Sequence, residues 1–289
     1  MLKYNKEELV KIAVTGCVDH PRVKGYYVGY DGKGRMPIGT GGIVYSHAIG
    51  DCCMNIAGDH IEPGISLANP SDKENHALET FACVGNEAKI INGPMKSKTG
   101  YVTGTHGGVD HTMVYMDKEV LEEMDSNETI LVKAYGQGLK LLDYPEIHMM
   151  NIDPDLLTAM PIHEEEGKVS FPVVTSVPSY LMGSGLGSST LMEGDYDIMT
   201  QDERANEIHG LNDLRFGDFV AIIDHDCHYG PHYYKGAVSI GVVVHSDSFT
   251  SGHGPGVCVV ATSKFGNITY RIEEDANLKT YMKHIKRSV

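Results

Sequence analysis

Residues 242–256, VVVHSDSFTSGHGPG, join a strand-like run to side chains that can bind a metal ion or move a proton. Alternate residues of an extended chain share a face, so His245 and Asp247 are expected side by side at the end of this strand. A histidine oriented by a carboxylate suits a general base or a metal ligand. We therefore predict that His245, Asp247 and His253 are catalytic. An ordinary hydrogen-bonded turn is the alternative.

Glycines recur through the end of the same segment. Because they lack side chains, they allow backbone N–H groups to converge on a ligand, so Gly252, Gly254 and Gly256 are predicted to bind one. Ser246 and Ser248 are disfavoured as nucleophiles, since no G-x-S-x-G elbow surrounds either of them.

A second cluster, DHDCHYGPH at residues 224–232, follows another apolar run. If the chain stays extended, Asp224, Asp226 and His228 point to one side. Imidazole and carboxylate donors suit zinc, iron or manganese, so these three residues are predicted metal ligands. The alternative is a polar loop with surface histidines.

The first half of the chain carries two comparable segments, GDHIEPG at 58–64 and HGGVDH at 106–111. Asp59, His60 and His106 are predicted to face the second-half centre and to bind the ligand there. A general base must lie within hydrogen-bond reach of its target, directly or through one water. A separation of more than about 15 Å between the two sets would exclude this pairing.

Short strands must position these groups. The apolar segments are brief and are bounded by glycine, aspartate and proline, and 33 glycines with no tryptophan favour tight turns. Strands and helices do not alternate regularly, which argues against a doubly wound fold. We predict a mainly β, β-rich α+β protein of antiparallel sheets or barrels with a few peripheral helices. These helices are expected at 117–124, at 152–160, from a capping box at 200–203 to residue 209, and at 274–285.

The polar run HEEEGK at residues 163–168 interrupts the apolar segments near the middle of the chain. We place a border there, between an N-terminal β-rich part, residues 1–162, and a C-terminal β-rich part, residues 163–289. A solvated loop inside one domain is the alternative.

Charge and apolar content limit the partners. The formal net charge of −15 repels a phosphate backbone, so no nucleic-acid partner is expected. No apolar run approaches the roughly 20 residues of a membrane helix, so no membrane partner is expected. The N-terminus lacks a signal-peptide core, and the six cysteines are scattered without a C-x-x-C pair. Both features favour a cytoplasmic location with reduced thiols.

Several blocks together resemble a bacterial and archaeal family catalogued as a domain of unknown function with N- and C-terminal parts. They are GDHIEPGISL, VTGTHGGVDH, KAYGQGLKLLDYP, MNIDPDLL, GDYDIMTQD, KGAVSIGVVVHSDS and GHGPGV. The resemblance spans roughly residues 10–265. It implies a cytoplasmic two-part β-rich protein, and it carries over no reaction and no catalytic residue.

Histidine, aspartate and glycine segments at predicted strand ends favour an enzyme. We predict a hydrolase or lyase that acts on a small polar metabolite with the help of a divalent transition metal such as Zn. The metal would lower the pKa of a bound water and so supply a nucleophile. Two alternatives stay open: a non-catalytic protein that binds a small metabolite or an anion, and a structural protein whose polar loops form an oligomer interface. The expected partners are a small-molecule ligand and further copies of the chain in a homo-oligomer.

Overall fold

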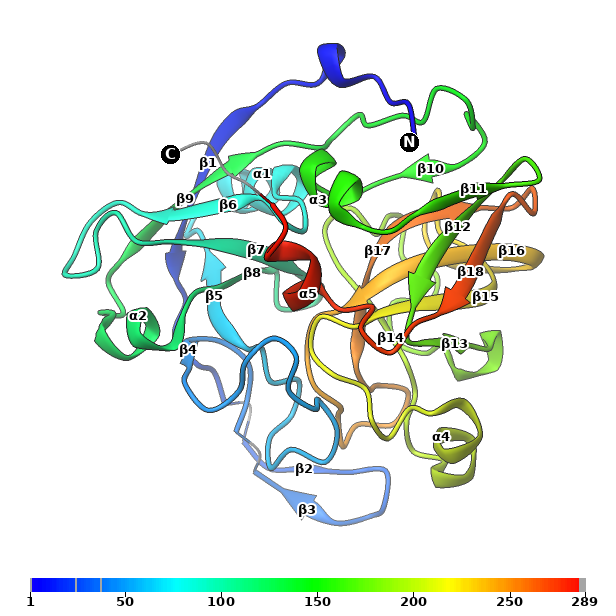
Figure 1. The fold of residues 1–289 in the computed structure, drawn as a ribbon. Helices are drawn as coiled ribbons and strands as arrows, with labels where there is room; N and C mark the ends of the chain where they lie inside the picture. The colour runs from blue at the N-terminus through cyan, green and yellow to red at the C-terminus, as the bar shows by residue number, and fades with distance from the viewer. Residues whose placement is uncertain (1, 24, 37, 286–289) are drawn as a thin grey trace.

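The structure, a computed structural model, describes residues 2–23, 25–36 and 38–285. These residues form 18 strands and five α-helices, and the longer strands fall into two groups (Figure 1). Most strand pairs in both groups are antiparallel, so the mainly β prediction is confirmed. Within the described ranges no helix is both long enough and apolar enough to cross a bilayer.

The first group of strands is a closed antiparallel barrel. Its six strands, in order of pairing, are β1 (Ile12–Val18), β9 (Thr129–Ala134), β6 (Glu87–Ile90), β7 (Thr99–His106), β8 (His111–Tyr115) and β5 (Gly64–Ala68). Pairing of β5 with β1 closes the ring, and the short β4 (Ile43–Val44) adds to β5. Buried apolar side chains such as Ile65, Val102 and Ile130 form the barrel core. The closed pairing agrees with the predicted barrel.

The second group is a six-stranded sheet. Its main path runs through β10 (His148–Met149), β17 (Gly256–Ser263), β16 (His232–Val243), β15 (Phe219–Asp226) and β13 (Thr175–Val177). The short β14 (Tyr196–Asp197) pairs with the beginning of β17. Only the β13–β15 pair of this sheet is parallel among the described strands. The last residues of β14 and β16 and the first residues of β17 therefore lie together at one end of the strands.

The polar run at residues 163–168 forms a hairpin. β11 (His163–Glu165) pairs with β12 (Lys168–Val173), which pairs in parallel with β18 (Ile268–Ile272). Residues before this run already pack with the second group, because β10 pairs with β17 and Leu156 shares a core with Phe219. The packed core therefore crosses the predicted border between residues 162 and 163. A separate hairpin joins β2 (Tyr27–Val28) to β3 (Gly34–Arg35).

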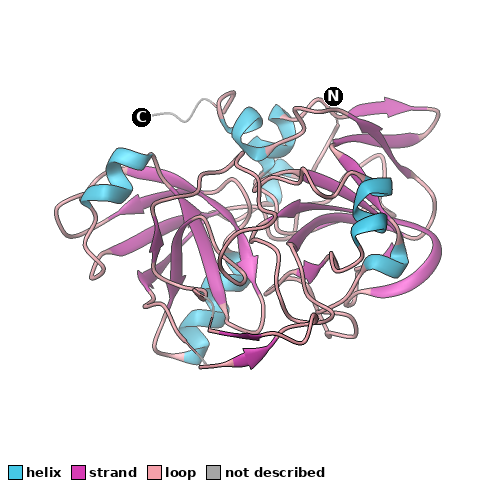
Figure 2. Cartoon of the chain, turned by 90° about the horizontal axis from the view of Figure 1, so that it is seen from below, coloured by secondary structure: helices cyan, strands magenta, loops and turns pink. Residues whose placement is uncertain are grey.

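The helices are short and lie around the two groups of strands (Figure 2). They are α1 (Asp72–Phe81), α2 (Lys118–Glu123), α3 (Pro154–Ala159), α4 (Glu203–His209) and α5 (Leu278–Met282), with 3-10 turns η1 (Lys6–Glu8) and η2 (Ser179–Leu181). The predictions of α2 and α3 are confirmed, and Asp153 caps α3 as expected. The α4 prediction placed the cap at residue 200, but the carboxylate of Asp202 caps this helix. Helix α1 was not predicted, since few of its residues are apolar.

Candidate metal centre

Chain segments from both groups of strands converge on one cluster of imidazole and carboxylate groups. His106 is the last residue of β7, and His60 lies in the loop before β5. His245 follows the end of β16 by two residues. The ring centroid of His245 lies 4.1 Å from that of His106 and 4.9 Å from that of His60. The expected meeting of first-half and second-half histidines is therefore confirmed.

Two buried hydrogen-bond acceptors face each other at the centre of this cluster. His245 Nδ1 donates to the Ser246 carbonyl at 2.8 Å, so in the neutral imidazole Nε2 carries a lone pair. Asp195 accepts the Gly107 N–H on Oδ1 at 2.9 Å, and its Oδ2 lies 2.6 Å from His245 Nε2. His245 Nε2 and Asp195 Oδ2, which we call the donor pair, are buried, and within the described part of the chain neither has a hydrogen-bond partner other than the opposite member of the pair.

A cation must relieve the repulsion within the donor pair. Burial lowers the pKa of His245, but the negative charge of Asp195 outweighs it and raises this pKa. A proton on Nε2 is therefore one candidate cation. A metal ion that both lone pairs bind is the other, and the further donors nearby favour it, since a proton needs only two partners.

His106 is oriented by a buried carboxylate. Its Nδ1 lies 2.5 Å from Glu62 Oε1. Glu62 also accepts hydrogen bonds from His111 Nδ1, at 2.9 Å, and from the Ser66 hydroxyl. Burial alone would raise the pKa of Glu62, but the hydrogen bonds of both histidines hold it below its usual range. Burial also lowers the pKa of His106, as does the charge of His245. A carboxylate behind Nδ1 that leaves Nε2 free is the usual support of a metal-binding histidine.

His60 is held in the same way by Asp59. Its Nδ1 lies 3.0 Å from Asp59 Oδ2, and the other Asp59 oxygen accepts the Ser248 hydroxyl at 2.7 Å. Burial would lower the pKa of His60, but hydrogen bonds to Asp197 and Asp59 raise it to about 10. His60 also adopts φ of 54°, a left-handed conformation that is costly for a residue with a side chain. Such strain collects at functional sites.

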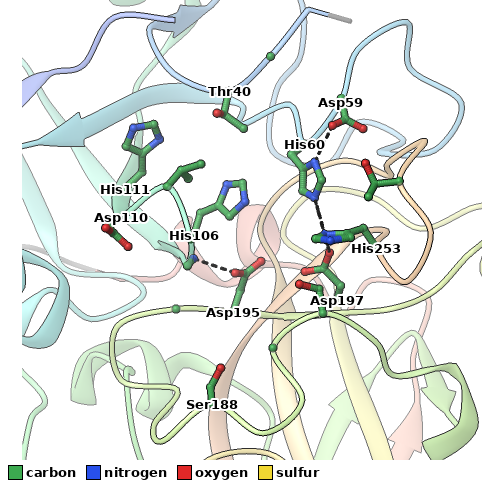
Figure 3. Close-up of a pocket in the computed structure, with 18 of the residues that line it drawn as sticks. Thr40, Asp59, His60, His106, Asp110, His111, Ser188, Asp195, Asp197 and His253 are labelled. Atoms are coloured by element: carbon green, nitrogen blue, oxygen red, sulfur yellow. Dashed lines mark hydrogen bonds and ion pairs between the residues drawn. The ribbon is translucent and has the colours of Figure 1, made fainter. Parts of the chain in front are cut away.

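Asp197 completes the cluster from the end of β14. Its Oδ2 lies 3.1 Å from His253 Nδ1 and 3.6 Å from His60 Nε2, and it accepts the Gly254 N–H at 3.3 Å. Its Oδ1 lies 3.7 Å from His245 Nε2. Asp197 therefore lies between the donor pair and two further imidazoles, those of His60 and His253. Figure 3 shows Asp197 beside His253, with His60 next to it.

Three overlapping sets of these side chains bring their donor atoms within 4.8 Å of one another. The sets are His60 with His106 and His245, His60 with Asp197 and His253, and Asp195 with Asp197 and His245. Imidazole nitrogens and carboxylate oxygens are the donors that zinc, manganese and iron take in proteins. The donor set fits a divalent transition metal.

A cavity of about 1160 Å³ opens beside the cluster. His60, His106, Asp195, Asp197 and His253 form one part of its wall, while His245 lies behind them and is fully buried. Hydroxyl side chains occupy other parts of the wall: Thr40, Ser184, Ser188, Ser189, Thr190 and Thr250. The cavity can therefore bring a small polar molecule to the metal donors.

The predicted glycines contact this centre through their backbone. A Cβ on Gly256 would overlap both atoms of the donor pair, and one on Gly254 would overlap the Ile198 carbonyl. The Gly254 N–H donates to Asp197. Gly252 needs φ of 82°, which favours glycine. Close approach to the donor pair accounts for Gly256, and close approach to the Ile198 carbonyl accounts for Gly254.

Comparisons with known proteins agree with the resemblance drawn from the sequence blocks. Family models of the domain of unknown function DUF4438 match residues 26–158 as its N-terminal part and residues 159–282 as its C-terminal part. The chain belongs to the DUF4438 family. The DUF4438 chain is similar to the crystal structure of TM1086, with a TM-score of 0.93 and 45% identity over 97% of this chain and 99% of that one. No curated protein matches it.

Asp247 of this DUF4438 chain has a different role from the predicted one. Its Oδ2 accepts the Asn55 N–H at 2.7 Å, and its backbone N–H donates to the Cys53 carbonyl. Asp247 therefore stabilises the loop at residues 53–55, which precedes His60. The carboxylate that lies beside His245 is that of Asp195. The alternation that paired residues 245 and 247 fails because β16 ends at Val243.

The predicted metal ligands Asp224, Asp226 and His228 do not join any of the three donor sets that the described residues form. Asp224 lies at a bulge within β15, with φ of 58°, and accepts the N–H of Gly236 in β16. Asp226 accepts the Thr262 hydroxyl, and His228 stacks on His148 with ring centroids 3.9 Å apart. A β-bulge between Ile223 and residue 225 breaks the alternation on which the prediction depended.

Asp195 and Asp197 were not predicted from the sequence. They belong to the segment GDYD, in which a glycine–aspartate pair reads as a turn. Their spacing is the signal that could have found them, because carboxylates two residues apart share a face of even a short strand. Glu62, which orients His106, lies in the GDHIEPG segment but was not among the predicted residues.

Proposed function

We propose that the protein is a metal-dependent hydrolase of a small polar metabolite, with a divalent transition metal such as zinc held by His245, Asp195 and Asp197, which form one of the three donor sets, and with His106 as a further donor beside His245. The donor pair carries this proposal: two buried ligand atoms lie 2.6 Å apart beside a large cavity, and among the described residues neither has another hydrogen-bond partner. A metal ion bound there would lower the pKa of a coordinated water and supply the nucleophile. This chemistry needs no serine or cysteine nucleophile.

The chain's own residues would prepare the centre for such a reaction. Glu62 and Asp59 fix the orientation of His106 and His60, so the free nitrogens point into the cluster. His253, whose side chain is one-third exposed, contacts the cavity and can meet a bound substrate. Arg22 is the only lysine or arginine among the described wall residues, whereas five carboxylates line the cavity. This balance favours a substrate that is neutral or cationic away from its reacting bond.

Metal-free and metal-reconstituted protein, assayed on a panel of small esters, lactones, amides and phosphoesters, test the proposal. We expect turnover only after reconstitution, with oxygen-18 from labelled water in the product. Full activity of the metal-free protein would refute the role of the metal. Metal-dependent turnover without the label would indicate a lyase instead, and ligand-induced thermal stabilisation without turnover would indicate a binding protein.

We further propose a cytoplasmic location and a homo-oligomeric state. All six cysteines are free, which supports a reducing compartment. Fractionation of cells that express the protein naturally tests the location, and light scattering of the purified protein measures the number of copies. Release in the periplasmic fraction, or the mass of a single chain, would contradict these two proposals.

A further inference from the structure

The cluster holds more donors than one ion uses. Four imidazoles and two carboxylates converge, while a catalytic zinc ion takes three protein ligands and keeps one position for water. Asp197 divides these donors, since its Oδ1 faces His245 and its Oδ2 faces His253 and His60. A carboxylate with donors on both sides can bridge two ions.

The donors beyond Asp197 form a compact second set. His60 Nε2 lies 3.1 Å from His253 Nδ1, which itself lies 3.1 Å from Asp197 Oδ2. Because Asp59 binds Nδ1 of His60, Nε2 is the nitrogen that faces His253 and Asp197. Two imidazole nitrogens and one carboxylate oxygen thus lie within 4.8 Å of one another. A second cation bound among these three atoms would take the place of the proton on His60 Nε2.

We propose that the centre holds two divalent transition-metal ions bridged by Asp197, the second ion being bound by His60 and His253. This inference rests on the metal site proposed above and adds a second ion to it. In two-metal sites the ions lie about 3.5–4 Å apart and stabilise both the attacking and the leaving oxygen of a displacement. The substrate class is therefore a phosphoester or carboxyl derivative that can place an oxygen on each ion.

Metal titration of the chelator-treated, full-length protein tests the proposal. With Mn²⁺ as the probe, we expect two ions per wild-type chain by calorimetry and elemental analysis, and an exchange-coupled electron paramagnetic resonance spectrum. His253→Gln should bind one ion and give the spectrum of isolated Mn²⁺. This variant is chosen because its side chain is partly exposed, so the fold tolerates the change.

His76→Gln is the matched control. His76 also pairs with a carboxylate, Glu193, at 3.1 Å, but it belongs to no donor set, so the variant should keep both ions. A wild-type chain that binds one ion, unchanged in His253→Gln, would overturn the second ion and leave the proposed function intact. A wild-type chain that binds no ion would overturn both.

Discussion

Replacing Asp195 with asparagine tests whether the cation between the two atoms of the donor pair is a metal ion or a proton. Asparagine keeps Oδ1 for the Gly107 N–H and puts an NH₂ group opposite His245 Nε2. A hydrogen bond then forms where two acceptors faced each other. The change also removes a negatively charged metal ligand, so stability and metal affinity should move in opposite directions.

The magnitudes follow from the burial of the donor pair. A buried acceptor without a partner costs about 1–3 kcal/mol, so metal-free Asp195→Asn should exceed metal-free wild type in stability by about that amount. For a chain of this size the melting temperature should rise by about 2–5 °C. Loss of a metal-supporting residue behind a ligand costs about 10–100-fold in affinity, so loss of a ligand should cost at least about 100-fold.

Thermal unfolding with chelator and with excess Zn²⁺ measures both effects, together with the metal content of each protein. Wild type should gain about 2.7 kcal/mol or more when Zn²⁺ exceeds its Kd 100-fold, and Asp195→Asn should gain little. Asp226→Asn is the control, because Asp226 is equally buried and lies outside the donor sets. If metal-free Asp195→Asn is less stable than wild type, a proton bridges the pair and the metal argument fails.

Three other substitutions test the surroundings of the centre. Gly256→Ala should abolish metal binding and cost about 1–3 kcal/mol through overpacking, whereas Gly34→Ala, with open space around it, should leave metal binding unchanged; equal metal content in the two variants would contradict this. Glu62→Gln should weaken metal binding about 10–100-fold by releasing His106, and an unchanged Kd would contradict its positioning role. Burial, then the nearby negative charges, raises the pKa of Glu79 to about 8, so its native form holds a proton that the unfolded chain releases above about pH 4.5. Wild-type stability should therefore fall as pH rises from about 4.5 to 8, by about 1–3 kcal/mol at pH 7, and Glu79→Gln should remove this slope in unfolding titrations; parallel pH profiles would refute it.

The sequence predicts the strand-rich fold because short apolar runs bounded by glycine, aspartate and proline leave room for little else. It also predicts helices with an unambiguous start, such as α3, where Asp153 caps the chain and Pro154 takes the first turn. Closure of the barrel is not predictable in this way. It depends on the pairing of β1 with β5, which are about 50 residues apart and carry no local signal for each other.

The histidines of the site are predictable from the sequence because they lie near the ends of predicted strands or in glycine-rich turns. His245 directly follows an apolar run, His106 and His253 adjoin glycines, and His60 follows a Gly-Asp pair. The structure brings all four together. The carboxylates follow another rule. Asp197 reaches the centre because β14 pairs with β17 so that Asp197 lies opposite Gly256, and only that register puts it between two groups of imidazoles. A long-range register of two residues decides which carboxylates complete the centre, and for that reason the nearest aspartate in sequence, Asp247, was the wrong partner for His245.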